Sequence, residues 1–194
     1  MGKVIVIEFV TLDGIIEDPD GTGGMPGGGW AFRTGPQAVT GDKFALGPIM
    51  ASGVLLLGRR TWDLFAARWP QRTGDFADAM NAMAKVVVSH RAPDLDVWSG
   101  SSHLDGDLID GVARLAGARD VVVAGSIGVV HQLAASDVVD EYRLLTFPVA
   151  LGAGARLFDA PTDLALVSTE PGPEAVLTRY ERVRPLVGAP SPRG

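Results

Sequence analysis

Short apolar runs rich in β-branched residues recur along the chain, and helical hydrophobic patterns lie between most of them. Such runs, when turn residues bound them, are typical of β-strands. The first run, Val4 to Val10, is apolar except for Glu8 and leads into Asp13. By this criterion the sequence predicts eight strands, near residues 3–10, 53–57, 85–89, 95–98, 120–124, 139–148, 163–169 and 174–183.

Helices are predicted in the intervals between these strands. Two of them cover residues 42–51 and 61–68. Three more carry apolar stripes at helical spacing, made of Phe76, Met80 and Met83; of Leu108, Ile109, Val112 and Leu115; and of Val129, Val130 and Leu133. These stripes are expected to face the core, and Ser126 is placed to cap the last helix.

The strand patterns also indicate how the sheet is built. Residues 54–57, 86–88 and 121–123 are apolar without alternation, as expected of central parallel strands that are buried on both faces. Residues 174–183 alternate more loosely and follow residues 163–169 after Glu170-Pro-Gly-Pro173, which indicates an antiparallel hairpin at the edge of the sheet. The predicted fold is therefore a mixed α/β sheet.

The 194 residues are expected to form one domain over residues 1–184, followed by a flexible tail at 185–194. Residues 18–29 contain too much glycine and proline for a regular element and are predicted to be a mobile loop after the first strand. Two interpretations of this loop are left open, a substrate lid and a plain disordered connection.

Composition and charge exclude several classes of protein. The net charge of −6 argues against a general nucleic-acid or acidic-membrane binder, which needs a basic face. The chain has no cysteine, which excludes disulfides, iron–sulfur clusters and thiolate zinc sites and fits a cytoplasmic protein. His90, His103 and His131 show no metal-ligand spacing, so no metal site is predicted. No apolar run approaches the length that spans a membrane.

The candidate chemistry begins at residues 53–61, where an apolar strand ends at Gly58 and is followed by Arg59, Arg60 and Thr61 at the start of a helix. Free N–H groups in a first helical turn attract anions, glycine lets a ligand approach the backbone, and arginine binds phosphate with two parallel hydrogen bonds. Solvated surface arginines are the alternative.

Two further strand ends carry similar residues. The run from Lys85 ends at Ser89, His90 and Arg91, and the run from Asp120 ends in the turn Gly125-Ser-Ile-Gly128. In an open parallel sheet the carboxyl ends of the strands share one edge, where ligands bind. The three strand ends are therefore expected to converge on one ligand.

Several motifs in this order and spacing resemble the dihydrofolate-reductase-like family over residues 3 to about 183. They are Thr11-Leu-Asp-Gly14, Leu56-Leu-Gly-Arg-Arg-Thr-Trp62, Val87-Val-Ser89, Val123-Ala-Gly-Ser126, Asp140-Glu-Tyr-Arg-Leu-Leu-Thr-Phe-Pro148 and Leu151-Gly-Ala-Gly-Ala-Arg-Leu-Phe158. Within the family the chain is most similar to stand-alone relatives of the reductase domain of the bifunctional riboflavin-biosynthesis deaminase-reductase. The resemblance implies an NADPH-dependent reductase with an eight-stranded, mostly parallel sheet.

The resemblance also implies roles for the strand-end residues. Gly58, Arg59, Arg60 and Thr61 would hold the pyrophosphate and the adenosine phosphate of NADPH, Ser89, His90 and Arg91 would flank the adenine ribose, and Gly125, Ser126, Ile127 and Gly128 would close around the pyrophosphate. Asp13 and Gly14 resemble the turn beside the nicotinamide, and Thr146 resembles a threonine that faces the substrate heterocycle.

A substrate that accepts hydride also needs a proton or a polarising donor, and Asp13 and Asp42 are the candidates. The alternative roles are a turn-forming aspartate for Asp13 and a helix N-cap for Asp42. The cysteine ligands of the zinc deaminase half of the riboflavin enzyme cannot exist in this chain.

The sequence thus favours a reductase that transfers hydride to a carbonyl or imine carbon of a small heterocyclic substrate. The alternatives are a true pyrimidine or pterin reductase of vitamin biosynthesis, and a regulatory module that binds NADP without turnover. A homodimer is also expected, because Leu157 and Phe158 lie in a glycine-rich loop that a monomer would leave exposed. The alternative is that both residues fold back onto their own sheet.

Overall fold

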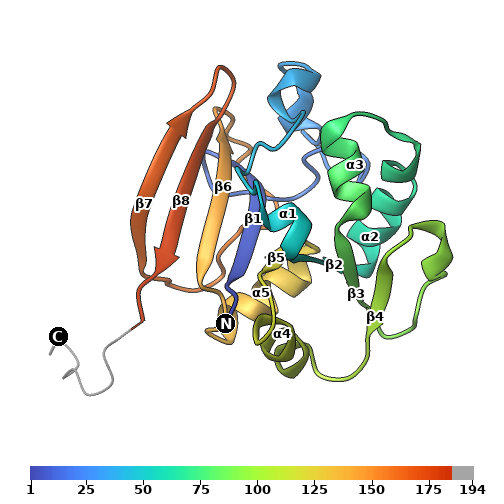
Figure 1. Cartoon of the computed structure of the whole chain (residues 1–194). Helices are drawn as coiled ribbons and strands as arrows, with labels where there is room; N and C mark the ends of the chain where they lie inside the picture. Colours follow the sequence, from blue (N-terminus) through green and yellow to red (C-terminus); the bar gives the residue numbers. More distant parts are fainter. Residues whose placement is uncertain (185–194) are drawn as a thin grey trace, which may run out of the picture.

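The computed structural model describes residues 1–184 and contains one eight-stranded sheet, with β4 at one end and β7 at the other (Figure 1). The strands are β1 Val4–Thr11, β2 Val54–Gly58, β3 Ala84–Val88, β4 Ser101–Leu104, β5 Val121–Val123, β6 Glu141–Phe147, β7 Leu164–Pro171 and β8 Val176–Arg182. Their order is β4-β3-β2-β5-β1-β6-β8-β7. In this order the first six strands, β4, β3, β2, β5, β1 and β6, are mutually parallel, and β8 pairs antiparallel with both β6 and β7. The predicted mixed α/β sheet with an antiparallel C-terminal pair is confirmed. The predicted tail at 185–194 lies outside the described residues.

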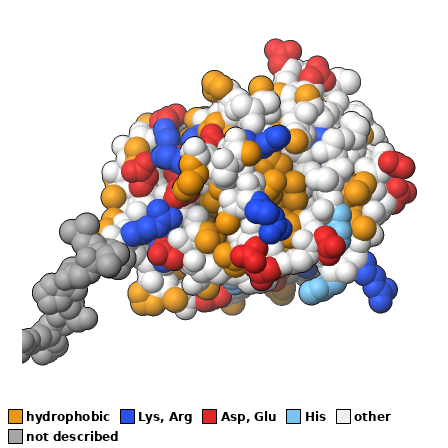
Figure 2. All heavy atoms as spheres, turned by 60° about the horizontal axis from the view of Figure 1, so that its bottom comes forward, with side chains coloured by type: hydrophobic (Ala, Val, Ile, Leu, Met, Phe, Trp, Pro, Cys, Tyr) orange, Lys and Arg blue, Asp and Glu red, His pale blue; other side chains and the backbone are white. Residues whose placement is uncertain are grey.

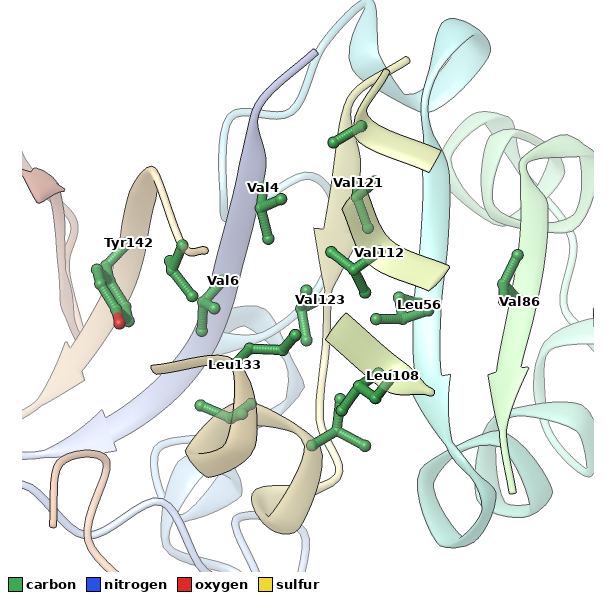
Figure 3. Packing of buried hydrophobic residues seen from close by; sticks show 14 of the residues in the cluster. Val4, Val6, Leu56, Val86, Leu108, Val112, Val121, Val123, Leu133 and Tyr142 are labelled. Atoms are coloured by element: carbon green, nitrogen blue, oxygen red, sulfur yellow. The ribbon is translucent and has the colours of Figure 1, made fainter. Parts of the chain in front are cut away.

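Helices cover both faces of the sheet. They are α1 Ile49–Ser52, α2 Arg59–Ala66, α3 Asp75–Ala82, α4 Leu108–Ala116 and α5 Ile127–Ala135. The first three pack on one face, and α4 and α5 pack on the other. Figure 3 shows Val4, Val6, Val121, Val123 and Leu56 of the central strands pointing toward Val112 and Leu108 of α4 and Leu133 of α5. Each of these buried side chains contributes about 1.5–3 kcal/mol through removal from water.

The alternation of side chains along β1 sets the two faces. Val4, Val6 and Val10 join the cluster beneath α4 and α5, while Ile5 and Ile7 join the cluster beneath α1, α2 and α3. Because successive side chains of a strand point to opposite faces, Glu8 shares the face of Val6 and Val10. This places a carboxyl group in an otherwise apolar row.

Two elements differ from the prediction. Residues 95–98 form no strand, because Leu95–Val97 is a 3₁₀ turn and the Trp98 ring turns inward over Lys85 Nζ, 4.5 Å from its centroid. The strand begins instead at Ser101, and its polar residues lack the apolar run by which the other strands were predicted. The predicted helix at 42–51 is reduced to α1, because Ala45 and Gly47 within this range take positive φ angles of 50° and 52°.

The segment at 18–29 has a defined conformation. The Asp18 carboxylate accepts hydrogen bonds from the backbone N–H groups of Gly23 (2.6 Å) and Met25 (2.9 Å), and Asp20 forms an ion pair with Arg68 at 2.6 Å. These bonds within and around the segment do not fit a plain disordered connection. The role of a lid stays a prediction.

The apolar loop used to predict a homodimer is not exposed. Leu157 is 3% exposed, and the Phe158 ring packs edge-on against Tyr142 with centroids 5.2 Å apart. The expectation of an uncovered patch at these residues is therefore wrong, because both side chains fold back onto their own sheet. The homodimer itself stays a prediction.

On the face drawn in Figure 2, Lys and Arg side chains are interspersed with Asp and Glu around exposed apolar side chains. That face carries no extended region of a single charge. Within residues 1–184, no helix is both long and apolar enough to cross a bilayer.

Candidate active site

The sheet has a topological switch point between β2 and β5. From β2 the chain passes through α2 to β3 on one side, and from β5 it passes through α5 to β6 on the other side. Helices α2 and α5 accordingly pack on opposite faces of the sheet, and their N-termini meet at the carboxyl ends of two adjacent strands. Ligands bind at such a crevice in open α/β sheets.

The two strand ends approach each other closely at this point. The backbone N–H of Gly58 donates to the carbonyl of Gly125 at 3.0 Å, and the Thr61 hydroxyl donates to Ser126 Oγ at 3.3 Å. A Cβ atom on Gly58 would overlap Ser126 Oγ and lie 2.9 Å from the Ser126 nitrogen. Glycine is therefore required at position 58 for the strand ends to come this close.

The first turns of α2 and α5 are suited to an anion. Neither helix has a side-chain hydrogen bond at its N-cap, and neither carries an acidic residue in its first turn. By contrast, α3 begins with Asp75 and Asp78, and Asp107 caps α4. Ser126 occupies the N-cap of α5 as predicted but does not cap it with its hydroxyl group. The helix dipoles at the switch point are therefore not neutralised by the protein's own carboxylates.

The predicted arginines differ in their surroundings. Arg59 Nε donates to the Asp63 carboxylate at 2.9 Å, one turn further along α2. The Arg60 side chain, in contrast, makes no hydrogen bond or ion pair within residues 1–184, and its guanidinium lies against Gly23 of the 18–29 segment. Arg60 is thus the more available cation for an incoming phosphate.

The predicted turn at Ser89, His90 and Arg91 follows β3, whose last residue Val88 pairs with Gly58. The Ser89 hydroxyl accepts a hydrogen bond from the Arg91 N–H at 3.2 Å and closes the turn. His90 and Arg91 are exposed. The turn lies at the same edge of the sheet as Gly58, one strand away.

Asp13 joins the loop after β1 to the loop after β6. Its carboxylate accepts hydrogen bonds from the Thr11 hydroxyl (2.6 Å) and from the N–H groups of Leu151 (3.1 Å) and Gly152 (2.7 Å). The Thr11 hydrogen bond, followed by the one from Gly152, lowers the pKa of Asp13 to about 2. A carboxylate that stays ionised has no proton to give at neutral pH, so this geometry favours the turn-forming role over that of proton donor. The neighbouring Gly14 takes a φ of 83° in the same turn.

Thr146 and Asp42 lie on opposite faces of the sheet. Thr146 pairs with Val10 and shares the face of Glu8, whereas its neighbour Leu145 points to the other face. Asp42 lines a cavity of about 210 Å³ on that other face, together with Leu145. Its carboxylate accepts hydrogen bonds from the N–H groups of Leu46 (2.9 Å) and Gly47 (2.7 Å), which closes a turn before α1. The structure therefore does not bring Thr146 and Asp42, two of the three predicted catalytic residues, together.

Glu8 is a site residue that the sequence interpretation missed. One of its carboxylate oxygens lies 3.8 Å from the point where a Cβ atom on Gly125 would stand, and the Thr61 hydroxyl lies 3.1 Å from the same point. Burial raises the pKa of Glu8 to about 8. The signal in the sequence was a lone carboxyl group within the apolar run Val4 to Val10.

A family model described as the RibD C-terminal domain matches residues 2–178. The chain belongs to this family. Two solved structures show the same fold as this RibD C-terminal domain. A "Putative riboflavin biosynthesis protein" from Shewanella sp. PV-4 is 21% identical, with a TM-score of 0.71 over 95% of this chain and 100% of that one. A pyrimidine reductase-like protein from Corynebacterium diphtheriae is 12% identical, with a TM-score of 0.57 over 94% and 92% of the two chains. No curated protein matches the chain.

The close approach at Gly58 gives a stability prediction. Gly58→Ala is expected to lower the free energy of unfolding by about 1–3 kcal/mol, because its Cβ would overlap Ser126. Gly128→Ala is the matched control, since no atom lies within 4 Å of its Cβ position and alanine favours the helix by roughly 0.5–1 kcal/mol. Urea denaturation of both variants measures the difference. Equal stability of Gly58→Ala and the wild type would contradict the prediction.

Proposed function

We propose that the protein is an NADPH-dependent reductase that transfers a hydride to a carbonyl or imine carbon of a small pyrimidine- or pterin-like heterocycle. The observation that carries this proposal is the meeting of two uncapped helix N-termini, those of α2 and α5, at the switch point of the sheet. Membership of the RibD C-terminal domain family supports a reductase. The pyrimidine reductase-like name of one structural neighbour supports the choice of a pyrimidine.

The donor set at the switch point fits a dinucleotide. The N–H groups of Ile127 and Gly128 in the first turn of α5 would hold the pyrophosphate, and the exposed Arg60 would bind a phosphate of the adenosine half. Gly128 has no neighbour within 4 Å of its Cβ position, which leaves room at this turn. NADPH, when bound, supplies the hydride, while the protein positions the reactants and supplies the electrostatic environment.

The function is tested by calorimetric titration of NADPH, followed by a screen of NADPH oxidation across pterins, ribosylaminopyrimidines, quinones and aldehydes. Binding together with turnover of a heterocycle is the expected result. Binding without turnover in any class would favour a regulatory module, and the absence of binding would refute the proposal.

The arginines predict a preference between the two nicotinamide cofactors. A phosphate bonded to a cation contributes about 1.5–3 kcal/mol, so we expect NADPH to bind about tenfold or more tightly than NADH. Arg60→Ala is expected to remove most of this preference and Arg59→Ala less, because Asp63 already pairs with Arg59. Arg114→Ala, in the last turn of α4, is the control. Equal affinities for NADPH and NADH in the wild type would exclude this assignment.

A further inference from the structure

The carboxyl group of Glu8 lies at the level of the sheet where the neighbouring strand β5 has ended. Val6 of β1 pairs with Val123, the last residue of β5, so β5 ends before the level of Glu8. The chain turns away there through Gly125, and the Glu8 carboxyl group occupies the space beside this glycine. Glu8 is partly exposed, in contrast to Val6 and Val10 on the same face. Its carboxyl group therefore borders the crevice and not only the core.

No hydrogen bond or ion pair holds the Glu8 side chain within residues 1–184. The other acidic side chain within β1 and β6, Glu141, shows what a structural carboxylate looks like in this protein. Glu141 is buried and contacts Arg143, Arg179 and Lys3. Glu8 has no such cation, so a structural ion pair does not account for a carboxyl group in this apolar row.

The elements around Glu8 carry few titratable groups. On the shared face β6 presents Tyr142, and α5 carries His131, which is engaged with Asp159 at 2.8 Å. Arg59 and Arg60 belong to the first turn of α2, which packs on the opposite face of the sheet. None of these is a cause of the raised pKa of Glu8, which comes from burial. Desolvation therefore favours the protonated form of Glu8, and a protonated carboxyl group can donate a hydrogen bond or a proton.

We propose that Glu8 is the general acid of the site, which protonates the substrate heteroatom as the adjacent carbon is reduced. The inference rests on the proposed reductase function and names Glu8 in place of Asp13 and Asp42 as the proton donor. Thr146 is a diagonal neighbour of Glu8 on the same face, because Thr146 pairs with Val10 and Glu8 pairs with Leu144. The two side chains thus border the same part of the crevice.

The proposed step balances in atoms and charge. The carbon of a C=O or C=N group would receive the hydride that NADPH supplies when bound, as the π bond opens and its electron pair moves to the oxygen or nitrogen. The Glu8 O–H bond breaks, and a new O–H or N–H bond forms on the substrate oxygen or nitrogen. Glu8 is left as a carboxylate and takes a proton from water before the next cycle.

The assignment is tested with Glu8→Gln, which keeps the size of the side chain and removes its proton. We expect turnover to fall by about 10²- to 10⁴-fold while the affinity for NADPH changes less than twofold. In the wild type, kcat/KM for the heterocycle that reacts fastest in the screen should fall above pH 8, and this alkaline limb should be absent in the variant. Glu170→Gln on the exposed strand β7 is the control and should match the wild type.

A second measurement needs no turnover. The ¹³C resonance of labelled Glu8, identified by its absence in Glu8→Gln, should titrate near pH 8. Titration below pH 6, or full turnover of Glu8→Gln with normal NADPH binding, would overturn the assignment of the acid. The absence of NADPH binding in the wild type would instead refute the proposed function, so the two failures are distinguishable.

Discussion

Replacing Glu8 with glutamine is expected to stabilise the folded protein at pH 8.5 and to leave its stability at pH 4.5 almost unchanged. Burial raises the pKa of Glu8 from 4.5 to about 8. Between these pH values the folded state keeps a proton that the unfolded state has released, so the free energy of unfolding falls as the pH rises. The difference, 8 − 4.5, is about 3.5 pKa units, which at 1.36 kcal/mol per unit sets an upper limit of about 5 kcal/mol.

Urea denaturation at pH 4.5, 6.5 and 8.5 measures this effect. Glu170→Gln serves as the control, because its exposed carboxylate should change the stability by less than about 0.5 kcal/mol at each pH. If the difference in the free energy of unfolding between Glu8→Gln and the wild type does not grow between pH 4.5 and 8.5, the Glu8 carboxyl group is well solvated. A protein that tolerates such a cost at a partly buried position commonly does so at a functional site.

The central part of the fold could be predicted from the sequence because its signals are local. The runs 54–57, 86–88 and 121–123 are apolar throughout, the last two made of valine alone, and they form parallel strands at the centre of the sheet. The strand β4 could not be found this way, because it is a short edge strand with Ser101, Ser102 and His103 in its four residues. Edge strands are partly solvated, so their sequences need no apolar run.

The candidate site was predictable in part for the same reason. The glycines at 58 and 125 follow apolar runs directly, and their place at strand ends is visible in the sequence. The surroundings of each carboxyl group were not visible, because they depend on distant residues. Asp13 is held by N–H groups of residues 151 and 152, and Glu8 lies beside Gly125, which is more than one hundred positions away.

The largest loss of stability is expected from replacing Glu141 with glutamine. The Glu141 side chain is 2% exposed, and Oε1 contacts Arg143 Nε at 2.7 Å and Arg179 at 3.0 Å. Arg143 is itself 6% exposed and donates to the carbonyl of Phe44 at 3.0 Å, which joins β6 to the segment before α1. Removing the carboxylate leaves a buried guanidinium without its counter-charge, a change that costs about 3–5 kcal/mol.

The control for this variant is Glu181→Gln. Glu181 pairs with the same Lys3 Nζ at 2.9 Å, but its side chain is 52% exposed, so its loss should cost at most about 1 kcal/mol. Thermal and urea denaturation at pH 7 should therefore separate the two variants clearly. Similar losses in both would mean that the Glu141 cluster is as well solvated as the surface pair.

The pH dependence of stability gives a second test of the role of Glu141. Burial raises the pKa of Glu141, but the hydrogen bond from Arg143 and the charges of Arg143 and Arg179 outweigh it and lower the pKa below 4.5. The folded state then releases the Glu141 proton more readily than the unfolded state. The stability from this group is full above about pH 4.5 and is lost as the pH falls through the folded pKa. Glu141→Gln should lack this contribution, so its stability relative to the wild type should improve as the pH is lowered from 5 to 3. The gain in the free energy of unfolding from Glu8→Gln should instead disappear as the pH is lowered from 8.5 to 4.5. Two glutamates on neighbouring strands would thus set the pH dependence of stability in opposite ranges. Glu141, which is paired with cations, acts at acid pH, and Glu8, which has no cation partner, acts at alkaline pH.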